Sequence, residues 1–286
     1  MRERAQRFDP RQIMHSPGFE IFHYRESNPE PVEVHHHDFY EIYCFLGGTV
    51  EFWVEGRICR LHPGDLLLIH PLELHRPIVQ PEKGAYERIV LWINKEYLSN
   101  LFADGVCLSR CFDVDLSGHA NLLHISSAKR SDVIARLGDL VRESYSTAFG
   151  SSLCAEGIFL QFMVELNRLA QQAGAHQEER EESSPLVSRI LEYIGEHYAE
   201  DLSLSSLAQQ FYVSKYHLSH EFSRTVGISV YRYIMLKRLL IAKQMLSEGH
   251  APGDVYTACG FHDYTNFYRA FKAEYGISPR AIYRQE

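Results

Sequence analysis

Apolar side chains recur every three or four residues through the last hundred residues of the chain, which is the spacing of amphipathic helices. Leu218 and Phe222 stand four residues apart in one such stretch, and Phe267 and Phe271 do so in another. The pattern predicts two helix–turn–helix units. Their expected helices are Ser205–Phe211 with Lys215–Thr225, and Gly253–Cys259 with Tyr264–Tyr275.

Between these units, Ser229–Ser247 is predicted to be one long helix with apolar residues around most of its circumference. A helix of this kind is buried on more than one side. Its expected length of about 28 Å is close to the ~34 Å between successive major-groove turns on one face of B-DNA. The helix is therefore long enough to hold two short units at adjacent grooves.

The two units close on the same motif. Phe222–Ser229 (FSRTVGIS) recurs as Phe271–Ser278 (FKAEYGIS), at an offset of 49 residues. Gly227 and Gly276 stand where each second helix must end, since glycine adopts the left-handed position after a helix at little cost. A repeat with a shared ending indicates a duplicated module.

These residues resemble the tandem helix–turn–helix domain of the AraC/XylS family of bacterial transcription regulators. The match lies in residues 186–286, with motifs at about 204–225 and 252–275. It rests on Leu207-Ala208, Ser214-x-x-x-Leu218-x-x-x-Phe222, Gly260-Phe261 and Gly276-Ile277-Ser278-Pro279-x-x-x-Tyr283-Arg284. The resemblance implies a double-stranded DNA operator as partner, and RNA polymerase as well if the protein is an activator.

Outward polar and aromatic residues of the two second helices are the expected DNA contacts. They are Lys215, Tyr216, His217, His220 and Arg224 in the first unit, and Tyr264, Thr265, Asn266, Tyr268, Arg269 and Lys272 in the second. His217 and His220 are expected at base edges. Arg224, late in its helix, is expected at a phosphate.

The second unit departs from the family pattern, so we expect the two units to be unequal. Ala208 follows Leu207 where two short helices cross closely, but the equivalent place after Val255 holds the bulky Tyr256. Pro252 also stands where an aliphatic core residue is usual, although proline is tolerated in a first helical turn, and Gly253 costs that helix about 1 kcal/mol relative to alanine. The alternative is a normal module with unusual side chains. The second unit is expected to contribute less sequence-specific affinity.

The region from Phe19 to Asn94 reads as short strands separated by glycine and proline, a pattern typical of a sandwich or barrel. The candidate strands are Val32–His37, Tyr40–Leu46, Val50–Val54, Arg57–Leu61, Asp65–Ile69, His75–Val79 and Arg88–Ile93. The tract His35–Glu41 (HHHDFYE), with Pro63-Gly64-Asp65 and Pro71-x-x-x-His75, resembles the motifs of cupins. This resemblance implies a barrel that binds an effector.

His35, His37 and Glu41 share one parity, so on a strand they project to one face, and His75 is expected opposite them. His36 is expected on the other face, exposed. Three alternatives stay open for the four residues: a catalytic site for a transition metal, a metal-free pocket for a polar effector such as a sugar, or a structural network. We expect the effector pocket and no cofactor, with the same four residues as ligands if a metal is bound.

Helices are predicted at Lys95–Ala103, Ser131–Thr147 and Ser152–Gln172. The apolar stripe of the last is expected either to form a homodimer contact or to pack on its own barrel. The predicted fold is α+β with two domains: a cupin-like β-barrel with helices over 1–172, expected to dimerise, and an all-α domain over 186–286. Residues 173–185, polar and charged, are predicted to be a flexible linker.

The net charge of −8 argues against a nucleic-acid binder until its distribution is considered. Residues 1–184 hold 18 basic and 27 acidic side chains, whereas residues 215–286 hold 10 basic and 6 acidic ones. Phosphate neutralisation depends on local cations, so the C-terminal excess is the relevant one. The six cysteines contain no C-x-x-C pair, and they do not support a methyl-acceptor repair protein of the kind that shares this DNA-binding domain.

No apolar run suits a signal peptide or membrane span, so a cytoplasmic protein without a membrane partner is expected. The sequence predicts a DNA-binding transcription regulator, not an enzyme, that is controlled by a small effector. The alternative is a metal-dependent cupin isomerase or dioxygenase with an attached DNA-binding module.

Overall fold

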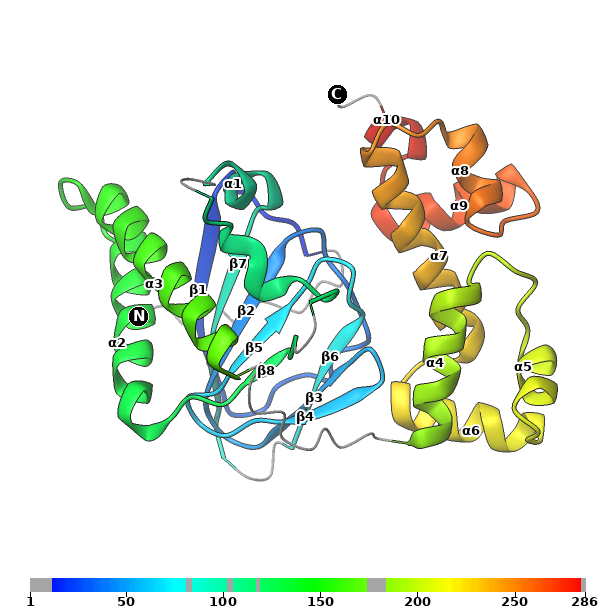
Figure 1. Ribbon diagram of the computed structural model, residues 1–286, viewed down its shortest axis with the longest axis horizontal. Helices are drawn as coiled ribbons and strands as arrows, with labels where there is room; N and C mark the ends of the chain where they lie inside the picture. The colour runs from blue at the N-terminus through cyan, green and yellow to red at the C-terminus, as the bar shows by residue number, and fades with distance from the viewer. Residues whose placement is uncertain (1–11, 81–83, 102–104, 117–118, 174–183, 284–286) are drawn as a thin grey trace. The chain divides into compact units, whose positions relative to one another are not determined.

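The computed structural model describes residues 12–80, 84–101, 105–116, 119–173 and 184–283 (Figure 1). The chain divides into two compact units, one formed by residues 1–54 and 58–181, the other by residues 55–57 and 182–286. The first is rich in β-sheet and the second is helical. The predicted two-domain α+β class is therefore confirmed. Among the described helices, none combines the length and apolar character that crossing a bilayer requires.

Two sheets form the framework of the first unit. The larger has the order β1-β7-β2-β5-β8 and the smaller the order β4-β3-β6. The strands are β1 (Phe19–Glu26), β2 (Tyr40–Gly47), β3 (Val50–Val54), β4 (Arg57–Arg60), β5 (Leu66–Ile69), β6 (His75–Val79), β7 (Tyr86–Ile93) and β8 (Leu122–Leu123).

Alternation along β2 sends its side chains into two different cores. Tyr43 and Phe45 join residues of β3 in the core between the two sheets. Ile42 and Cys44 point the other way, into the core that the larger sheet shares with helices. Glu41 has the parity of Tyr43, so it faces the space between the sheets, and only 5% of its surface is exposed. The predicted inward direction of Glu41 is confirmed.

Helices cover the outer face of the larger sheet (Figure 1). They are α1 (Lys95–Asn100), α2 (Ser127–Ser144) and α3 (Ser151–Ala173), with a short 3-10 segment, η2 (Leu108–Phe112). Phe159, Phe162 and Leu166 of α3 are buried in the core of their own unit. The apolar stripe of α3 therefore packs on its own sheet, which was one of its two predicted roles.

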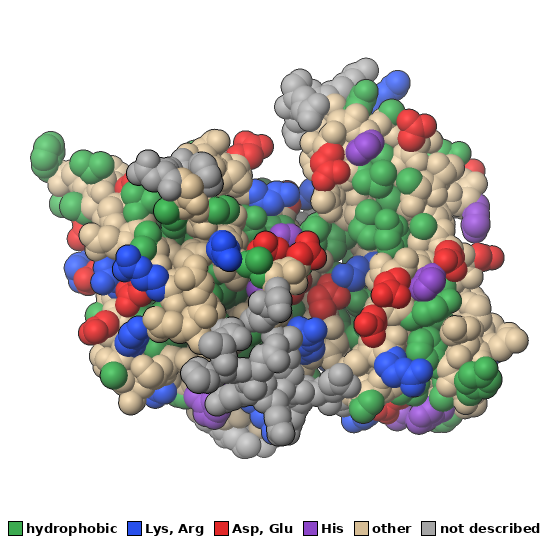
Figure 2. Space-filling model, viewed as in Figure 1, with side chains coloured by type: hydrophobic (Ala, Val, Ile, Leu, Met, Phe, Trp, Pro, Cys, Tyr) green, Lys and Arg blue, Asp and Glu red, His purple; other side chains and the backbone are tan. Residues whose placement is uncertain are grey.

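The turn between α2 and α3 carries exposed apolar side chains, visible as a green group at the upper left of Figure 2. Tyr145 and Phe149 of the turn, and Leu153 near the start of α3, have exposed side chains. The Tyr145 hydroxyl nevertheless donates to the carbonyl of Ile21 at 3.0 Å, so this turn is tied to β1.

Two parts of the strand prediction were wrong. The expected strand Val32–His37 is irregular, with one isolated bridge between His35 and His75. His36 is buried instead of exposed, because side chains do not alternate strictly where the backbone is not a strand. The edge strand β1, which pairs with β7, was missed because His23, Tyr24 and Arg25 interrupt its apolar pattern.

The second unit contains the predicted helix pairs. Its helices are α4 (Pro185–His197), α5 (Leu204–Gln210), α6 (Lys215–Val226), α7 (Val230–Ser247), α8 (Pro252–Ala258), α9 (Tyr264–Tyr275) and α10 (Pro279–Tyr283). Gly227 and Gly276 end α6 and α9 with φ of 93° and 74°, as the repeat predicts. The central helix α7 contacts α6, α8, α9 and α10, which explains its apolar circumference.

The predicted linker lies mostly outside the described residues. Ala173 is the last residue of α3 and Pro185 is the first residue of α4, so both ends of the predicted range 173–185 are helical. Residues 174–183, between them, are not among those that the structure describes.

Candidate functional site

The four predicted pocket residues of the first unit lie together, and we call His35, His37, Glu41 and His75 the inner cluster. The rings of His35 and His75 have centroids 4.3 Å apart, and those of His37 and His75 are 4.9 Å apart. His37 Nε2 lies 3.1 Å from Glu41 Oε2. All four residues are buried. The sequence therefore predicted their convergence, although His35 and His37 come from an irregular segment and not from a strand.

Each histidine of the inner cluster directs its Nδ1 atom to a backbone carbonyl two residues away. His35 bonds Glu33 at 2.9 Å, His37 bonds Phe39 at 2.8 Å and His75 bonds Glu73 at 2.9 Å. A carbonyl oxygen can only accept, so each Nδ1 must carry the proton and donate. In a neutral ring the Nε2 atom is then a lone pair that can accept a hydrogen bond or bind a metal.

The charge states make the inner cluster rich in acceptors. Burial, reinforced by neighbouring imidazoles, lowers the pKa of His35 and that of His75 well below the usual histidine value. Burial alone would raise the pKa of Glu41, but interactions with His37, His35 and Trp92 outweigh it and lower that pKa. The cluster thus presents two neutral imidazoles and an ionised carboxylate at neutral pH.

The Nε2 atom of His75 is a buried acceptor that a hydrogen-bond donor or a cation could satisfy. His75 Nε2 is fully buried and makes no hydrogen bond within the described residues. An unsatisfied buried polar atom costs about 1–3 kcal/mol, which a bound partner can recover. Ligand atoms of His37, Glu41 and His75 all lie within 4.8 Å of one another. Imidazole and carboxylate donors suit a transition metal, and an Nδ1–H held by a carbonyl is the usual support for a metal-binding histidine. The donor set therefore fits a metal as well as a polar ligand.

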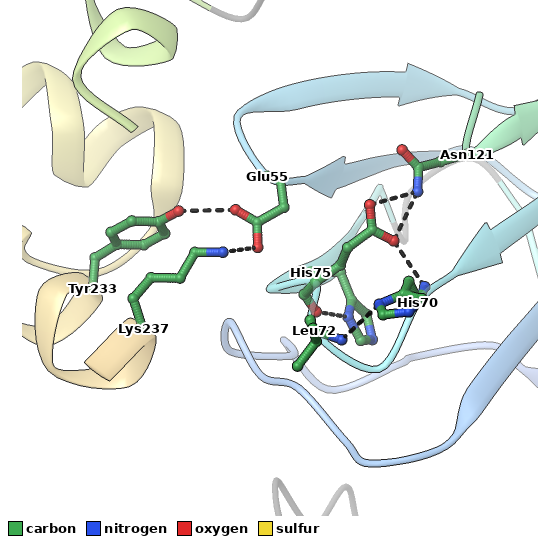
Figure 3. A network of polar contacts seen from close by, with 8 residues as sticks. Glu55, His70, Leu72, His75, Asn121, Tyr233 and Lys237 are labelled. Carbon is green, nitrogen blue, oxygen red and sulfur yellow. Dashed lines mark hydrogen bonds and ion pairs between the residues drawn. The ribbon is translucent and has the colours of Figure 1, made fainter. Parts of the chain in front are cut away.

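Glu73 fixes His75, and sequence reasoning missed it. Its backbone carbonyl accepts from His75 Nδ1, while its carboxylate accepts from the backbone N–H of His70 at 2.8 Å and from Asn121 Nδ2 at 2.9 Å (Figure 3). Trp92 plays a comparable part for Glu41, since its Nε1 donates to Oε2 at 3.1 Å. The spacing Glu73-x-His75 is only a weak sign that Glu73 supports His75. Nothing in the sequence links Glu73 or His75 to Asn121.

In the second unit, α6 turns the predicted contact residues outward. Ser214 caps the helix, because its hydroxyl accepts from the His217 backbone N–H at 3.1 Å. Leu218 and Phe222 are fully buried, so the helix packs on the core through the face that carries them. The other face is exposed, and it carries Lys215, Tyr216, His217, His220 and Arg224. A shallow groove runs along it, lined by Tyr216, Ser219, His220, Ser223 and Arg224.

Arg224 is held in place before any partner binds. Its Nη2 lies 2.7 Å from Glu221 Oε1, and this contact lowers the pKa of Glu221. The guanidinium side chain remains 62% exposed. Arg224 is thus oriented but accessible, which suits a contact with phosphate.

In α9, the N-cap is Asp263, whose side chain accepts from the Asn266 backbone N–H at 2.8 Å. Of the predicted contacts, Tyr264, Thr265, Asn266, Arg269 and Lys272 are exposed. Tyr268 is half-buried, which differs from the fully outward position expected. Both α6 and α9 therefore display a polar face, but that of α9 is partly closed at Tyr268.

Tyr256 lies where the family pattern has a small residue, and it is accommodated partly buried against the core of the second module. Its ring packs edge-on against Tyr264, with centroids 5.6 Å apart and planes at 83°. In the first module, Ala208 and Leu207 are both buried where α5 crosses α6. The bulky ring therefore contacts Tyr264, the first residue of α9.

Comparison with known proteins agrees with this division of the chain. A model for an AraC-like ligand binding domain matches residues 16–163, and one for a helix-turn-helix domain matches residues 207–285. The HTH-type transcriptional activator RhaS of Escherichia coli is 23% identical over 249 residues, which cover 87% of this chain and 86% of that protein.

Similar solved structures include the C-terminal domain of AraT, a response regulator from Geobacillus stearothermophilus. It is 30% identical and covers 36% of this chain and 87% of its own, with a TM-score of 0.35. Wild-type ToxT from Vibrio cholerae, bound to an unsaturated fatty acid, is 11% identical and covers 94% of this chain and 95% of its own, with a TM-score of 0.40.

Proposed function

The chain belongs to the AraC/XylS family of DNA-binding transcription regulators, and from that premise we propose that α6 and α9 read a DNA operator under the control of a small molecule bound at the inner cluster. The observation that carries the DNA-reading part is the outward polar face of α6 and its counterpart on α9, each fixed by a buried pair of core residues. Homodimer formation, and contact with RNA polymerase if the protein activates transcription, stay predictions.

His217 and His220 are the proposed base-reading residues of α6. Both are exposed in the first half of the helix, where side chains reach base edges in helix–turn–helix complexes. A specific base contact contributes about 1–3 kcal/mol, or roughly 5–150-fold in affinity. When that contact is removed, the loss of affinity should therefore depend on the base at one position only.

Selection from a random duplex pool, followed by affinity measurements at fixed salt, tests this part of the proposal. His217→Ala and His220→Ala should each relax the preference at one position, with a loss in the range given above. His250→Ala is the matched control, because His250 is exposed in the same unit but lies after α7, off both reader helices. If both variants select the parental sequence with parental affinity, α6 is not the reader.

The chemistry of the inner cluster suggests the class of effector. Buried imidazole and carboxylate acceptors need a ligand that donates hydrogen bonds. The hydroxyl groups of a sugar or related polar metabolite meet that need. Such a ligand acts as a switch only if it binds one conformation of the regulator more tightly than another.

A screen of sugars and sugar acids for a rise in unfolding temperature tests the effector part. A ligand that binds only the native protein stabilises it by about 2.7 kcal/mol at a concentration 100 times its Kd. The rise should vanish in Glu41→Gln and persist in Glu51→Gln, a carboxylate paired with Arg60 away from the cluster. A rise that survives Glu41→Gln would place the ligand elsewhere.

The carbonyl-bound Nδ1 atoms favour one alternative, a resident transition metal and with it a metal-dependent cupin enzyme. Elemental analysis of untagged protein separates the two. If the pocket is metal-free, the protein should contain less than about one tenth of an equivalent of transition metal per chain. A full equivalent that is lost in Glu41→Ala would overturn the metal-free pocket and promote the enzyme.

A further inference from the structure

Three residues outside the inner cluster meet on the surface of the first unit, and we call His62, Asp65 and His124 the surface cluster. His62 lies between β4 and β5, Asp65 directly precedes β5, and His124 directly follows β8. The pairing of β5 with β8 joins Leu66 to Leu123 and Leu67 to Leu122. This register is what brings His124 beside Asp65 from 59 residues away in the sequence.

Two of the ligand-atom distances match those between atoms bound to one metal ion, and the shorter of them is a hydrogen bond between His124 and Asp65 in the structure. Asp65 Oδ2 lies 2.9 Å from His124 Nδ1 and 3.5 Å from His62 Nδ1. Two ligand atoms each about 2.1 Å from one ion are about 3.0 Å apart at a right angle and about 3.4 Å apart at the tetrahedral angle. The three groups each offer one ligand atom, and these atoms all lie within 4.8 Å of one another.

The carboxylate is preorganised, whereas the imidazoles are open to solvent. The Asp65 side chain is only 2% exposed, and its Oδ2 also accepts from the backbone N–H of His62 at 2.8 Å. The backbone N–H of Gly64 donates to the carbonyl of Phe45, which anchors the turn to β2. The side chains of His62 and His124 are 72% and 43% exposed. Water can therefore complete the coordination of an ion held by the three residues.

From this geometry we propose that the surface cluster is a site for a divalent transition metal such as Zn²⁺, separate from the inner cluster and independent of the proposed regulatory function. Two imidazoles and one carboxylate are donors that suit zinc, cobalt or nickel better than magnesium or calcium. The bound ion ties the β4–β5 turn to the segment between β8 and α2, so it stabilises the first unit.

Arg130 is the neighbouring positive charge. Its side chain packs over Gly64, where an added Cβ would meet its Cγ, Cδ and Nε at 2.4 to 2.9 Å. A cation near the ion weakens its binding. Arg130→Gln should therefore tighten zinc binding, whereas removal of ligands should weaken it.

Zinc titration of the untagged full chain by calorimetry, with cobalt absorption as a second probe, tests the proposal. The paired substitution His62→Ala with His124→Ala should remove one equivalent of zinc. Loss of one supporting group costs roughly 10–100-fold in metal affinity, so loss of two direct ligands should cost at least that much. The zinc-induced rise in unfolding temperature should disappear with it.

Two controls separate this site from other histidines. His15→Ala removes an exposed histidine of the same unit that lies outside both clusters, and Glu41→Gln alters the inner cluster. Both variants should still bind one equivalent of zinc at the surface cluster. The double variant also loses the 2.9 Å contact of His124 Nδ1 with the buried Asp65 carboxylate, so the unfolding temperature of each variant is compared with and without zinc. Unchanged zinc stoichiometry and affinity in the folded double variant would overturn the proposal.

Discussion

The two helix–turn–helix modules share a frame but differ in how that frame is supported. Each buries two side chains of its second helix, Leu218 with Phe222 and Phe267 with Phe271, and each ends that helix on a left-handed glycine. The first helices begin differently. Ser203 and Ser206 form a reciprocal capping box at α5, whereas α8 begins after Ala251 without a side-chain cap.

The turns between the helices differ as well. In the first module, the left-handed position after α5 is occupied by Tyr212, with φ of 57°, and two residues separate it from α6. In the second, the same position is Gly260, and three residues separate it from α9. Gly260 packs so closely on Ala199 that an added Cβ would lie 2.6 Å from the Ala199 carbonyl oxygen. The second module needs its glycine, and the first tolerates a ring.

This comparison shows that a duplicated sequence pattern preserves the core and leaves the exposed surface free to diverge. Tyr256 packs on Tyr264, and Tyr268 is half-buried, so aromatic side chains of the second module partly cover the outward face of α9. In the first module the equivalent residue is Ala208, which has no ring that could cover α6. We therefore expect α6 to contribute more sequence-specific affinity than α9.

The largest expected effect is at the turn of the second module. Gly260→Ala should lower the free energy of unfolding by roughly 1–3 kcal/mol, because it combines a left-handed alanine with a clash against backbone. Tyr212→Ala, at the equivalent turn, should change stability by less than half of that, since the position already holds a side chain. Urea unfolding of both variants measures the difference, and equal losses would show that the two turns are equivalent.

The next effect is the helix cap. Ser203→Ala should cost about 0.5–2 kcal/mol, because it removes one hydrogen bond of the capping box and leaves the Ser206 backbone N–H unsatisfied. Ala251→Ser, which adds a cap residue to α8, should stabilise the protein by a smaller amount. Thermal unfolding of the two variants should give shifts of opposite sign, and shifts of the same sign would contradict the assignment of the caps.

A smaller effect of the opposite sign is expected at Tyr212. A left-handed non-glycine residue costs roughly 1–2 kcal/mol, while glycine loses about 0.5–1 kcal/mol more through its unfolded-state entropy. Tyr212→Gly should therefore raise the unfolding free energy by about 0.5–1 kcal/mol. Tyr216→Gly, at the second residue of α6, should lower it. A loss of stability in Tyr212→Gly would mean that its exposed ring makes a stabilising contact.

The smallest effect concerns phosphate contacts. Arg224→Gln should reduce the slope of log affinity against log salt by about 1, with little change in which sequence is preferred. Lys95→Gln is the control, because Lys95 is exposed on α1 of the other unit. A changed base preference in Arg224→Gln, with an unchanged slope, would make Arg224 a base contact.

The sequence predicted the second unit better than the first. The reader helices and α7 were located to within a residue, because buried residues at i and i+4, N-caps and terminal glycines all agree there. Val187, Ile190, Leu191 and Ile194 have the spacing of an amphipathic helix and are buried in α4, a helix that the sequence prediction lacks. Segments as short as β8 carry no periodicity to detect.

The inner cluster was predicted as a set because parity and the separate His75 were visible in the sequence. Its supports were not, because Glu73 and Asn121 meet only after the chain folds. The surface cluster was missed for the same reason: its geometry depends on the pairing of β5 with β8, and no sequence rule gives that register.

A base-substitution scan across a selected operator, at one salt concentration, tests the central claim most directly. It measures the loss of affinity at each base pair of the half-site read by α6 and of the half-site read by α9. We predict losses of about 1–3 kcal/mol per specific base pair at the α6 half-site, and clearly smaller losses at the α9 half-site. Losses of similar size at both half-sites would contradict the inequality of the two modules.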